Sequence, residues 1–254
     1  MTDAHLHLYD CVQQNPDYTS TWFCYGIPCV LSAWNREAFD YHWEIAQEAP
    51  RTAPVLLSFG VHPQMPAAAM PDAFALFERL ADEQKIDAVG ECGFDLYDSR
   101  FRETEQIQEQ LFKAQLAVAC EKQLPVIIHA RRAIHKLFPH TRALKKVPAV
   151  IFHSWAGTVA DGEALLKRGI NAFFSFGNTV FLNHKWTVRS ASALPVERLL
   201  SETDAPYQGR RGCSSSCWHD LPLIIAEIGR LRTDQAVQSR IEKNFYKAFH
   251  GYDF

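Results

Sequence analysis

The chain has 254 residues, of which 47% are hydrophobic and 22% are charged, as in an ordinary globular protein with a large core. Its formal net charge of -3 excludes a general attraction to nucleic acid, so a nucleic-acid substrate must bind to a local patch. No apolar stretch approaches the roughly 20 residues that span a bilayer, and the start of the chain lacks the pattern of a signal peptide. Seven scattered cysteines favour reduced thiols, so we expect a cytoplasmic protein that does not contact membranes.

Short runs of apolar and β-branched residues alternate with longer amphipathic segments along the chain. The short runs predict eight strands, at residues 2–8, 27–32, 55–61, 86–91, 125–129, 149–153, 172–176 and 199–203. The amphipathic segments predict helices at residues 36–49, 72–84, 103–123, 133–144, 159–168, 221–231 and 233–249. In the clearest of them, 103–123, the helical spacing is carried by Ile107, Leu111, Ala114, Gln115 and Val118.

This alternation predicts an α/β protein with a single (β/α)8 TIM barrel over residues 1–254. A doubly wound open sheet is the alternative. It more often has fewer strands and a glycine-rich phosphate loop, and the sequence contains neither a GxGxxG motif nor a Walker-type loop. We find no domain boundary, internal repeat or low-complexity segment. The stretch 207–218, rich in Gly, Ser, Arg and Cys, is predicted to be a loop after the eighth strand.

Histidines and carboxylates gather at the carboxyl ends of the predicted strands. His5 and His7 end the first strand, and their i, i+2 spacing places both imidazoles on the same face of it. The later strands are followed or ended by His62, Glu91, His129, Arg131, His153 and Asp204. Because the carboxyl ends of the strands form the active-site face of a TIM barrel, we expect these side chains to converge.

The converging side chains have the chemistry of a site for two divalent metal ions. Four imidazoles and two carboxylates are too many for one tetrahedral ion that keeps an open position. They suit two ions about 3.5–4 Å apart, with Glu91 as the bridge because it comes between the two pairs of histidines in strand order. The mixed nitrogen and oxygen donors suit Zn, Mn, Ni, Co or Mg without choosing among them. The proposed ligands are His5, His7, Glu91, His129, His153 and Asp204.

Six motifs, in the right order and spacing, carry a resemblance to the TatD family of metal-dependent hydrolases, a branch of the amidohydrolase-type barrels. They are DAHLH, GVHP, GECGFD, PVIIHAR, HSWAG and ETDAP, and residues 244–249 resemble the closing segment of the family. The resemblance implies a (β/α)8 barrel that cleaves phosphodiester bonds, usually in DNA and often from the 3′ end. It also implies that one ion is held by His5, His7, Glu91 and Asp204, and the other by Glu91, His129 and His153.

Two segments depart from the family pattern. The family usually has Cys-Phe-Ser-Gly after the histidine of the sixth strand, where this chain has Ser-Trp-Ala-Gly at residues 154–157. After ETDAP, residues 208–218 replace a short loop that contains Asn and Pro. Neither change touches a proposed ligand, so both concern the substrate. Cys213 and Cys217 in the second segment lack two further well-placed ligands, which disfavours a structural zinc there.

Three side chains are predicted to act on the substrate beside the metals. Asp204 is the best general base for a water that the ions activate. Arg131 would contact a phosphate, because a planar guanidinium matches two phosphate oxygens; the alternative is a structural salt bridge. His62 would donate a hydrogen bond to a phosphate or to the water, and the alternative is a cap on the turn before Pro63.

Other residues near the proposed site have two interpretations each. Asp95 and Glu202 either orient a ligand imidazole or form ordinary ion pairs. Trp155 either stacks on a base or fills the barrel mouth. Arg210 and Arg211 either contact a nucleic-acid backbone or stay solvated.

We therefore expect a metal-dependent phosphodiesterase, most specifically a DNase that works as a 3′–5′ exonuclease. Its substrate would be DNA or a small phosphodiester. We expect a monomer without an obligate protein partner. An amide or lactone hydrolase on the same barrel is the main alternative. Related barrels of that kind often bridge their metals with a carboxylated lysine on the fourth strand, where this chain has Glu91. A non-catalytic binding protein would need a broken ligand set, and none of the six positions is lost.

Overall fold

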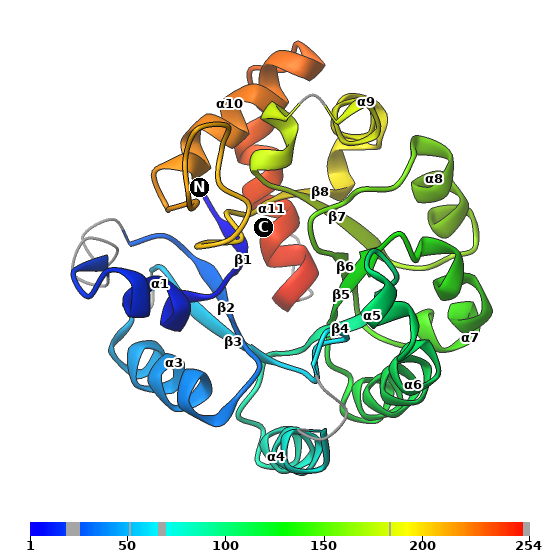
Figure 1. The fold of residues 1–254 in the computed structure, drawn as a ribbon. Coiled ribbons are helices and arrows are strands. Elements are labelled where there is room, and N and C mark those ends of the chain that lie inside the picture. Colours follow the sequence, from blue (N-terminus) through cyan, green and yellow to red (C-terminus); the bar gives the residue numbers. More distant parts are fainter. Residues whose placement is uncertain (19–25, 51, 66–69, 183, 251–254) are drawn as a thin grey trace.

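The computed structural model describes residues 1–18, 26–50, 52–65, 70–182 and 184–250. Eight strands form one sheet in the order β1 to β8, and the neighbouring strands pair in parallel. Hydrogen bonds at the ends of β1 and β8 complete the ring: Asp204 N donates to His5 O (3.0 Å), and His7 N donates to Ala205 O (2.8 Å). Helices surround the ring (Figure 1), so the predicted TIM barrel is confirmed. Residues 251–254, the end of the predicted domain, lie outside the described residues.

All of the predicted strands are present; β7 has the predicted bounds, and the ends of the others are shifted. They are β1 (Asp3–Leu6), β2 (Cys29–Ala33), β3 (Val55–Phe59), β4 (Ala88–Asp95), β5 (Val126–Arg131), β6 (Val150–Phe152), β7 (Ala172–Phe176) and β8 (Leu199–Ser201). The prediction that Glu91 ends the fourth strand is wrong, because β4 continues to Asp95. Gly93 allows the strand to continue close to β5: a Cβ on Gly93, at φ 133°, would lie 2.2 Å from His129 O.

The helices alternate with the strands. They are α1 (Leu8–Gln14), α3 (Arg36–Glu48), α4 (Met70–Asp82), α5 (Ser99–Arg102), α6 (Glu105–Lys122), α7 (Thr141–Leu144), α8 (Val159–Lys167), α9 (Lys185–Ala193), α10 (Asp220–Arg232) and α11 (Val237–His250), with 3-10 helices at Ile134–His140, Asn178–Phe181 and Val196–Arg198. The sequence prediction omits the α-helices α1, α5 and α9. The predicted helix 133–144 is a 3-10 helix followed by the short α7, because Pro139 has no N–H to continue an α-helical ladder. None of the helices within the described residues is both long and apolar enough to cross a membrane.

The buried face of α6 differs from the predicted one. Its fully buried residues include two glutamines, Gln108 and Gln115, which hold the ends of two strands. Gln115 Oε1 accepts from Val61 N at 2.7 Å, and Gln108 Oε1 accepts from Asp95 N at 2.9 Å. Of the predicted repeat only Gln115 is buried; Ile107, Leu111, Ala114 and Val118 are partly buried, and the buried face is centred on Phe112, Leu116 and Ala119 instead.

The interior of the barrel has an apolar layer below a polar one. The apolar layer contains Val30, Leu56, Ile127, Ile151, Phe173 and Leu200. Because side chains alternate along a strand, the residues two positions further on face the same interior. These residues are Ser32, Ser58, His129, His153, Ser175 and Glu202. The change from apolar to polar residues within two positions places the site above a packed floor.

The last helix closes the amino-terminal end of the barrel. Phe245, Ala248 and Phe249 of α11 pack against the apolar layer, and Figure 1 shows α11 in the middle of the ring. Asn244 Nδ2 donates to Val196 O and Leu199 O, both at 2.8 Å, and so fixes α11 to the start of β8. The open end of the barrel is therefore the carboxyl end of the strands.

A buried neutral histidine, His42, is expected to make the fold sensitive to acid. Burial lowers its pKa to about 3, and Nε2 accepts from Tyr9 N at 3.0 Å. Below the ordinary pKa only the unfolded chain binds this proton, so stability falls as the pH drops from 6.5 toward 3. We expect His42→Gln to reduce that slope by about 1.4 kcal/mol per pH unit. The free energy of unfolding, measured by urea unfolding at several values between about pH 6 and pH 4, gives this slope.

The exposed His135 gives the matched control, because His135→Gln should leave the slope unchanged. Equal slopes in wild type and His42→Gln would contradict the assignment of the acid sensitivity to His42.

Candidate metal centre

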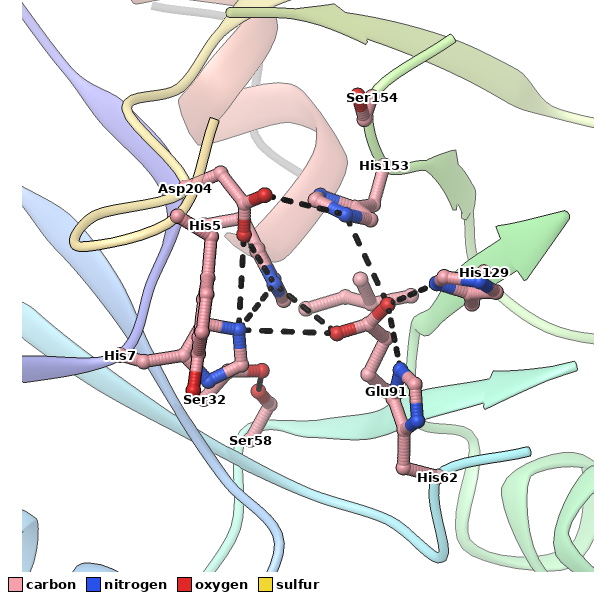
Figure 2. A network of polar contacts seen from close by, with 12 residues as sticks. His5, His7, Ser32, Ser58, His62, Glu91, His129, His153, Ser154 and Asp204 are labelled. Atoms are coloured by element: carbon pink, nitrogen blue, oxygen red, sulfur yellow. Dashed lines mark hydrogen bonds and ion pairs between the residues drawn. The ribbon is translucent and has the colours of Figure 1, made fainter. Parts of the chain in front are cut away.

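The predicted ligands meet at the carboxyl end of the barrel (Figure 2). His5 lies in β1 and His7 directly after it, Glu91 lies in the middle of β4, and His129 lies in β5. His153 and Asp204 follow the ends of β6 and β8. All of them except His129 are buried, and His129 is half-buried.

One group of donors surrounds a point between β1, β4 and the end of β8. The Nε2 atoms of His5 and His7 lie 3.1 Å apart, and each lies 3.6 Å from Asp204 Oδ1. Glu91 Oε2 lies 3.2 Å from His5 Nε2 and 3.8 Å from His7 Nε2. Donor atoms at tetrahedral corners about 2.0–2.2 Å from an ion are about 3.3–3.6 Å apart, so these four donors fit one ion.

A second group surrounds the other oxygen of Glu91. Oε1 lies 2.6 Å from His129 Nδ1, 3.3 Å from His62 Nε2 and 3.7 Å from His153 Nε2. His62 is therefore closer to Glu91 than His153 is, which the resemblance did not imply. Donor atoms of His62, Glu91 and His129 all lie within 4.8 Å of one another. Donor atoms of His5, Glu91 and His153 form a separate set within the same distance.

Each imidazole has one ring nitrogen that points away from Glu91, and the partner of that far nitrogen shows whether the near nitrogen can bind a cation. His129 Nε2 lies 3.0 Å from Asp95 Oδ2, and His153 Nδ1 lies 3.1 Å from Glu202 Oε1. A carboxylate at the far nitrogen takes the proton there, so the near nitrogen keeps its lone pair. Asp95 and Glu202 thus orient imidazoles rather than pair with arginine or lysine.

His62 has the opposite arrangement. Its Nδ1 accepts from Gln64 N at 3.1 Å, so the proton of the neutral ring lies on Nε2. Burial lowers the pKa of His62, which favours the neutral ring. Nε2 therefore donates toward Glu91 Oε1 and has no lone pair for an ion. The ring therefore caps the turn before Pro63, and its contact with a phosphate or with the water stays a prediction.

The buried carboxylates at this end of the barrel need cations to balance their charge. The buried carboxyl groups that face the imidazoles are those of Glu91, Asp95, Glu202 and Asp204. Within the described part of the chain none of them pairs with a lysine or arginine; the ion pairs they make are all with histidines. Burial would raise the pKa of Glu91, but the neighbouring imidazoles outweigh burial and hold that pKa well below its usual range. Buried carboxylates surrounded by imidazoles fit a site for metal cations.

A model of the family described as TatD related DNase matches residues 2–250. The chain belongs to the TatD-related DNase family. The 3′-5′ ssDNA/RNA exonuclease TatD of Pantoea ananatis is 37% identical over 171 residues, which cover 66% of this chain and 59% of that protein. The protein of the same name from Erwinia tasmaniensis is 31% identical over 212 residues, covering 79% and 74%. The chain thus matches under two thirds of the length of the Pantoea relative.

Solved structures share the barrel. The crystal structure of YjjV, a TatD homologue from Escherichia coli, matches with a TM-score of 0.82 at 23% identity and covers 98% of both chains. An uncharacterized amidohydrolase from Saccharomyces cerevisiae matches with a TM-score of 0.75 at 14% identity, covering 98% of this chain and 99% of that one. These likenesses establish the fold of this TatD-related chain.

The two segments that depart from the TatD pattern, 154–157 and 208–218, meet at Asp204. The sequence does not suggest that they lie together. Gln208 Nε2 donates to Asp204 Oδ2 at 2.6 Å, and its Oε1 lies 2.9 Å from Ser154 Oγ. Ser154, Asp204 and Gln208 all have positive φ, at 44°, 53° and 55°. Such backbone is uncommon for residues other than glycine and collects at functional sites. Gln208 therefore fixes the oxygen of Asp204 that points away from His5 and His7.

Removal of this contact is expected to weaken metal binding. Gln208→Leu frees the Asp204 carboxylate to rotate, and loss of such a supporting contact typically lowers metal affinity by about 10–100-fold. We expect about tenfold, measured by competition with a chromogenic chelator. Gln235→Leu, at an exposed position, is the matched control. Equal affinity in Gln208→Leu and wild type would contradict the role of Gln208.

The other predicted site residues take different places. Arg131 is exposed and stacks on Tyr97, with its guanidinium carbon 3.7 Å from the ring centroid. Trp155 is 2% exposed and packs edge-on against Phe174, so it fills the barrel mouth. Arg210 pairs with Asp220 at 2.7 Å. Arg211 is exposed.

The cysteine pair in the segment after Asp204 takes no part in the metal centre. Cys213 and Cys217 carry free thiols, and neither belongs to any of the metal-ligand clusters found among the described residues.

The metal centre opens into a cavity of about 790 Å³. The walls combine the ligands with aromatic and cationic side chains, among them Trp34, Arg131 and Tyr207. Trp34 is 38% exposed and Tyr207 is 48% exposed, so their rings are accessible from the cavity mouth. A cavity of this size, with charged groups at its base and aromatic walls, has the dimensions of a site for a small ligand.

Proposed function

We propose that this chain is a divalent-metal-dependent phosphodiesterase that hydrolyses DNA from the 3′ end. The observation that carries the proposal is the buried Glu91, whose two oxygens face two separate groups of imidazoles at the base of an open cavity. The names of the TatD relatives, which are described as 3′-5′ ssDNA/RNA exonucleases, support the substrate class.

In this proposal one ion binds to His5, His7, Glu91 and Asp204, and the other to Glu91, His129 and His153. Bound there, divalent ions supply an activated water and neutralise charge on the phosphate. Asp95 and Glu202 hold the second pair of imidazoles, as the distances above describe.

The remaining side chains move a proton and hold the phosphate. Asp204 takes the proton of the attacking water, with one oxygen fixed by Gln208 and the other facing the site. His62 donates from Nε2 to a phosphoryl oxygen, because its Nδ1 is held by Gln64 N. Arg131, on the cavity wall, contacts the non-bridging oxygens. Trp34 and Tyr207 offer rings on which a base can stack.

Arg131 separates phosphodiester chemistry from amide or lactone chemistry. A phosphate carries charge on two oxygens throughout the reaction, whereas a neutral lactone develops one oxyanion that the ions can stabilise alone. Arg131→Ala should therefore lower kcat/KM on single-stranded DNA and on bis(p-nitrophenyl) phosphate by about 2 kcal/mol, about 30-fold. Steady-state assays on both diesters and a lactone panel measure the effect.

Metal content serves as the control, and it should stay at the wild-type value because a guanidinium does not bind a cation. Equal rates of diester cleavage in Arg131→Ala and wild type, or a wild-type preference for a lactone by orders of magnitude, would contradict the proposed function.

A further inference from the structure

A second arginine lies beside Arg131 outside the cavity. The guanidinium carbons of Arg131 and Arg132 lie 3.7 Å and 4.6 Å from the centroid of the Tyr97 ring. Consecutive residues of a strand point to opposite faces, so two neighbouring side chains do not normally reach one ring. Arg132 has a φ of 56°, and this left-handed backbone brings both guanidiniums to Tyr97.

Neither guanidinium is neutralised. In the described part of the chain, the arginines that form ion pairs are Arg36, Arg100, Arg210, Arg230 and Arg240. Arg131 and Arg132 are both exposed, and among the described residues no carboxylate lies at ion-pair distance from them. Two like charges on one ring repel each other, which favours an anion between them or beside them. Stacking on the ring leaves the N–H edges of a guanidinium free to bind it.

The ring is tied to the metal centre. Tyr97 N donates to Asp95 Oδ1 at 2.8 Å, and Asp95 Oδ2 holds the His129 imidazole. Arg102 donates to the carbonyl oxygens of Leu96 and Tyr97 at 3.2 Å and 3.0 Å. Tyr97 is 45% exposed despite these contacts, so its ring is held in place and accessible beside the cavity.

We propose that Arg132, stacked on Tyr97 beside Arg131, forms a second phosphate position, which binds the backbone of a single-stranded polynucleotide where it leaves the cavity, while Arg131 contacts the phosphate that is cleaved. Arg131 lines the cavity and Arg132 lies beyond it, so the two mark the path of the chain. The inference rests on the proposed function and adds a preference for polynucleotides over small phosphodiesters. It assigns a phosphate contact to Arg132, to which the mechanism gives no role.

The test compares Arg132→Gln with wild type on a single-stranded oligonucleotide and on bis(p-nitrophenyl) phosphate. We expect KM for the oligonucleotide to rise about tenfold with kcat unchanged, because a charged hydrogen-bond partner of one phosphate is lost. The dependence of log KM on log salt should also fall by about 0.7, the value for one phosphate contact of a single strand. KM for the small diester should not change. Arg132→Lys, which keeps the charge, should restore the salt dependence.

Arg79, exposed on α4 and without an ion pair in the described structure, gives the matched control: Arg79→Gln should change none of these values. An unchanged oligonucleotide KM and salt dependence in Arg132→Gln would overturn the inference. So would an equal rise in KM on both substrates, since that marks a structural effect. Failure of the proposed function is distinguishable, because wild type would then cleave neither diester.

Discussion

Replacement of Glu91 by glutamine is expected to reduce phosphodiester cleavage on the order of 10³-fold. The glutamine keeps the shape of the side chain but removes the charge that both donor groups share. Its amide would also place N–H groups against one set of imidazoles, 2.6 Å from His129 Nδ1 or 3.2 Å from His5 Nε2. We therefore expect both ions to be lost. Elemental analysis of the purified variant, together with kcat/KM on single-stranded DNA, measures the two effects.

Glu78→Gln on the exposed face of α4 is the matched control and should behave like wild type in metal content and rate. Wild-type metal content and rate in Glu91→Gln would show that Glu91 does not bridge two ions.

Replacement of Asp204 by asparagine is expected to act on one ion only. Gln208 Nε2 donates to one Asp204 oxygen, so the asparagine carbonyl should turn toward Gln208 and present its NH₂ group to His5 and His7. We expect the ion of that group to be lost while the Glu91, His129 and His153 ion is retained. Loss of both a ligand and the general base should lower kcat on the order of 10³-fold.

The contrast between the two variants is the informative result. Metal content should fall by one ion per chain in Asp204→Asn and by two in Glu91→Gln. Equal metal content in the two variants would contradict the assignment of Glu91 to both groups and Asp204 to one. Cleavage by Asp204→Asn at the wild-type rate would show that Asp204 has no catalytic role.

The sequence predicts the barrel and its convergent donors well, for physical reasons that operate locally. Apolar runs such as 172–176 are bounded by turn residues, and β7 has those ends. Parallel strands bring their carboxyl ends together, so His5, His7, His129 and His153 could be placed near one another before the fold was known. The position of Glu91 within β4 could not, because the close packing of Gly93 against β5 depends on the partner strand.

Unlike Asp95 and Glu202, the supporting glutamines escape prediction, because a glutamine amide is recognised only by what it contacts. Gln208 and Ser154 are far apart in sequence and meet at Asp204. Gln108 and Gln115 lie seven residues apart on the buried face of α6, and two polar residues at that spacing on an apolar face were an available signal. A single domain over residues 1–254, a monomer and a cytoplasmic location stay predictions of the sequence.

The central claim is that ions held by Glu91 and its histidines cleave phosphodiester bonds on a barrel that folds without them. The most direct measurement follows a 5′-labelled single-stranded DNA incubated with the protein after chelation, and again after Mg, Mn, Co, Ni or Zn is restored, with circular dichroism recorded in parallel. We predict that chelation abolishes cleavage, that the spectrum is unchanged because the apolar layer and α11 support the barrel, and that restored metal shortens the DNA from its 3′ end. Undiminished cleavage in chelator, or no cleavage with any of these metals, would contradict the claim.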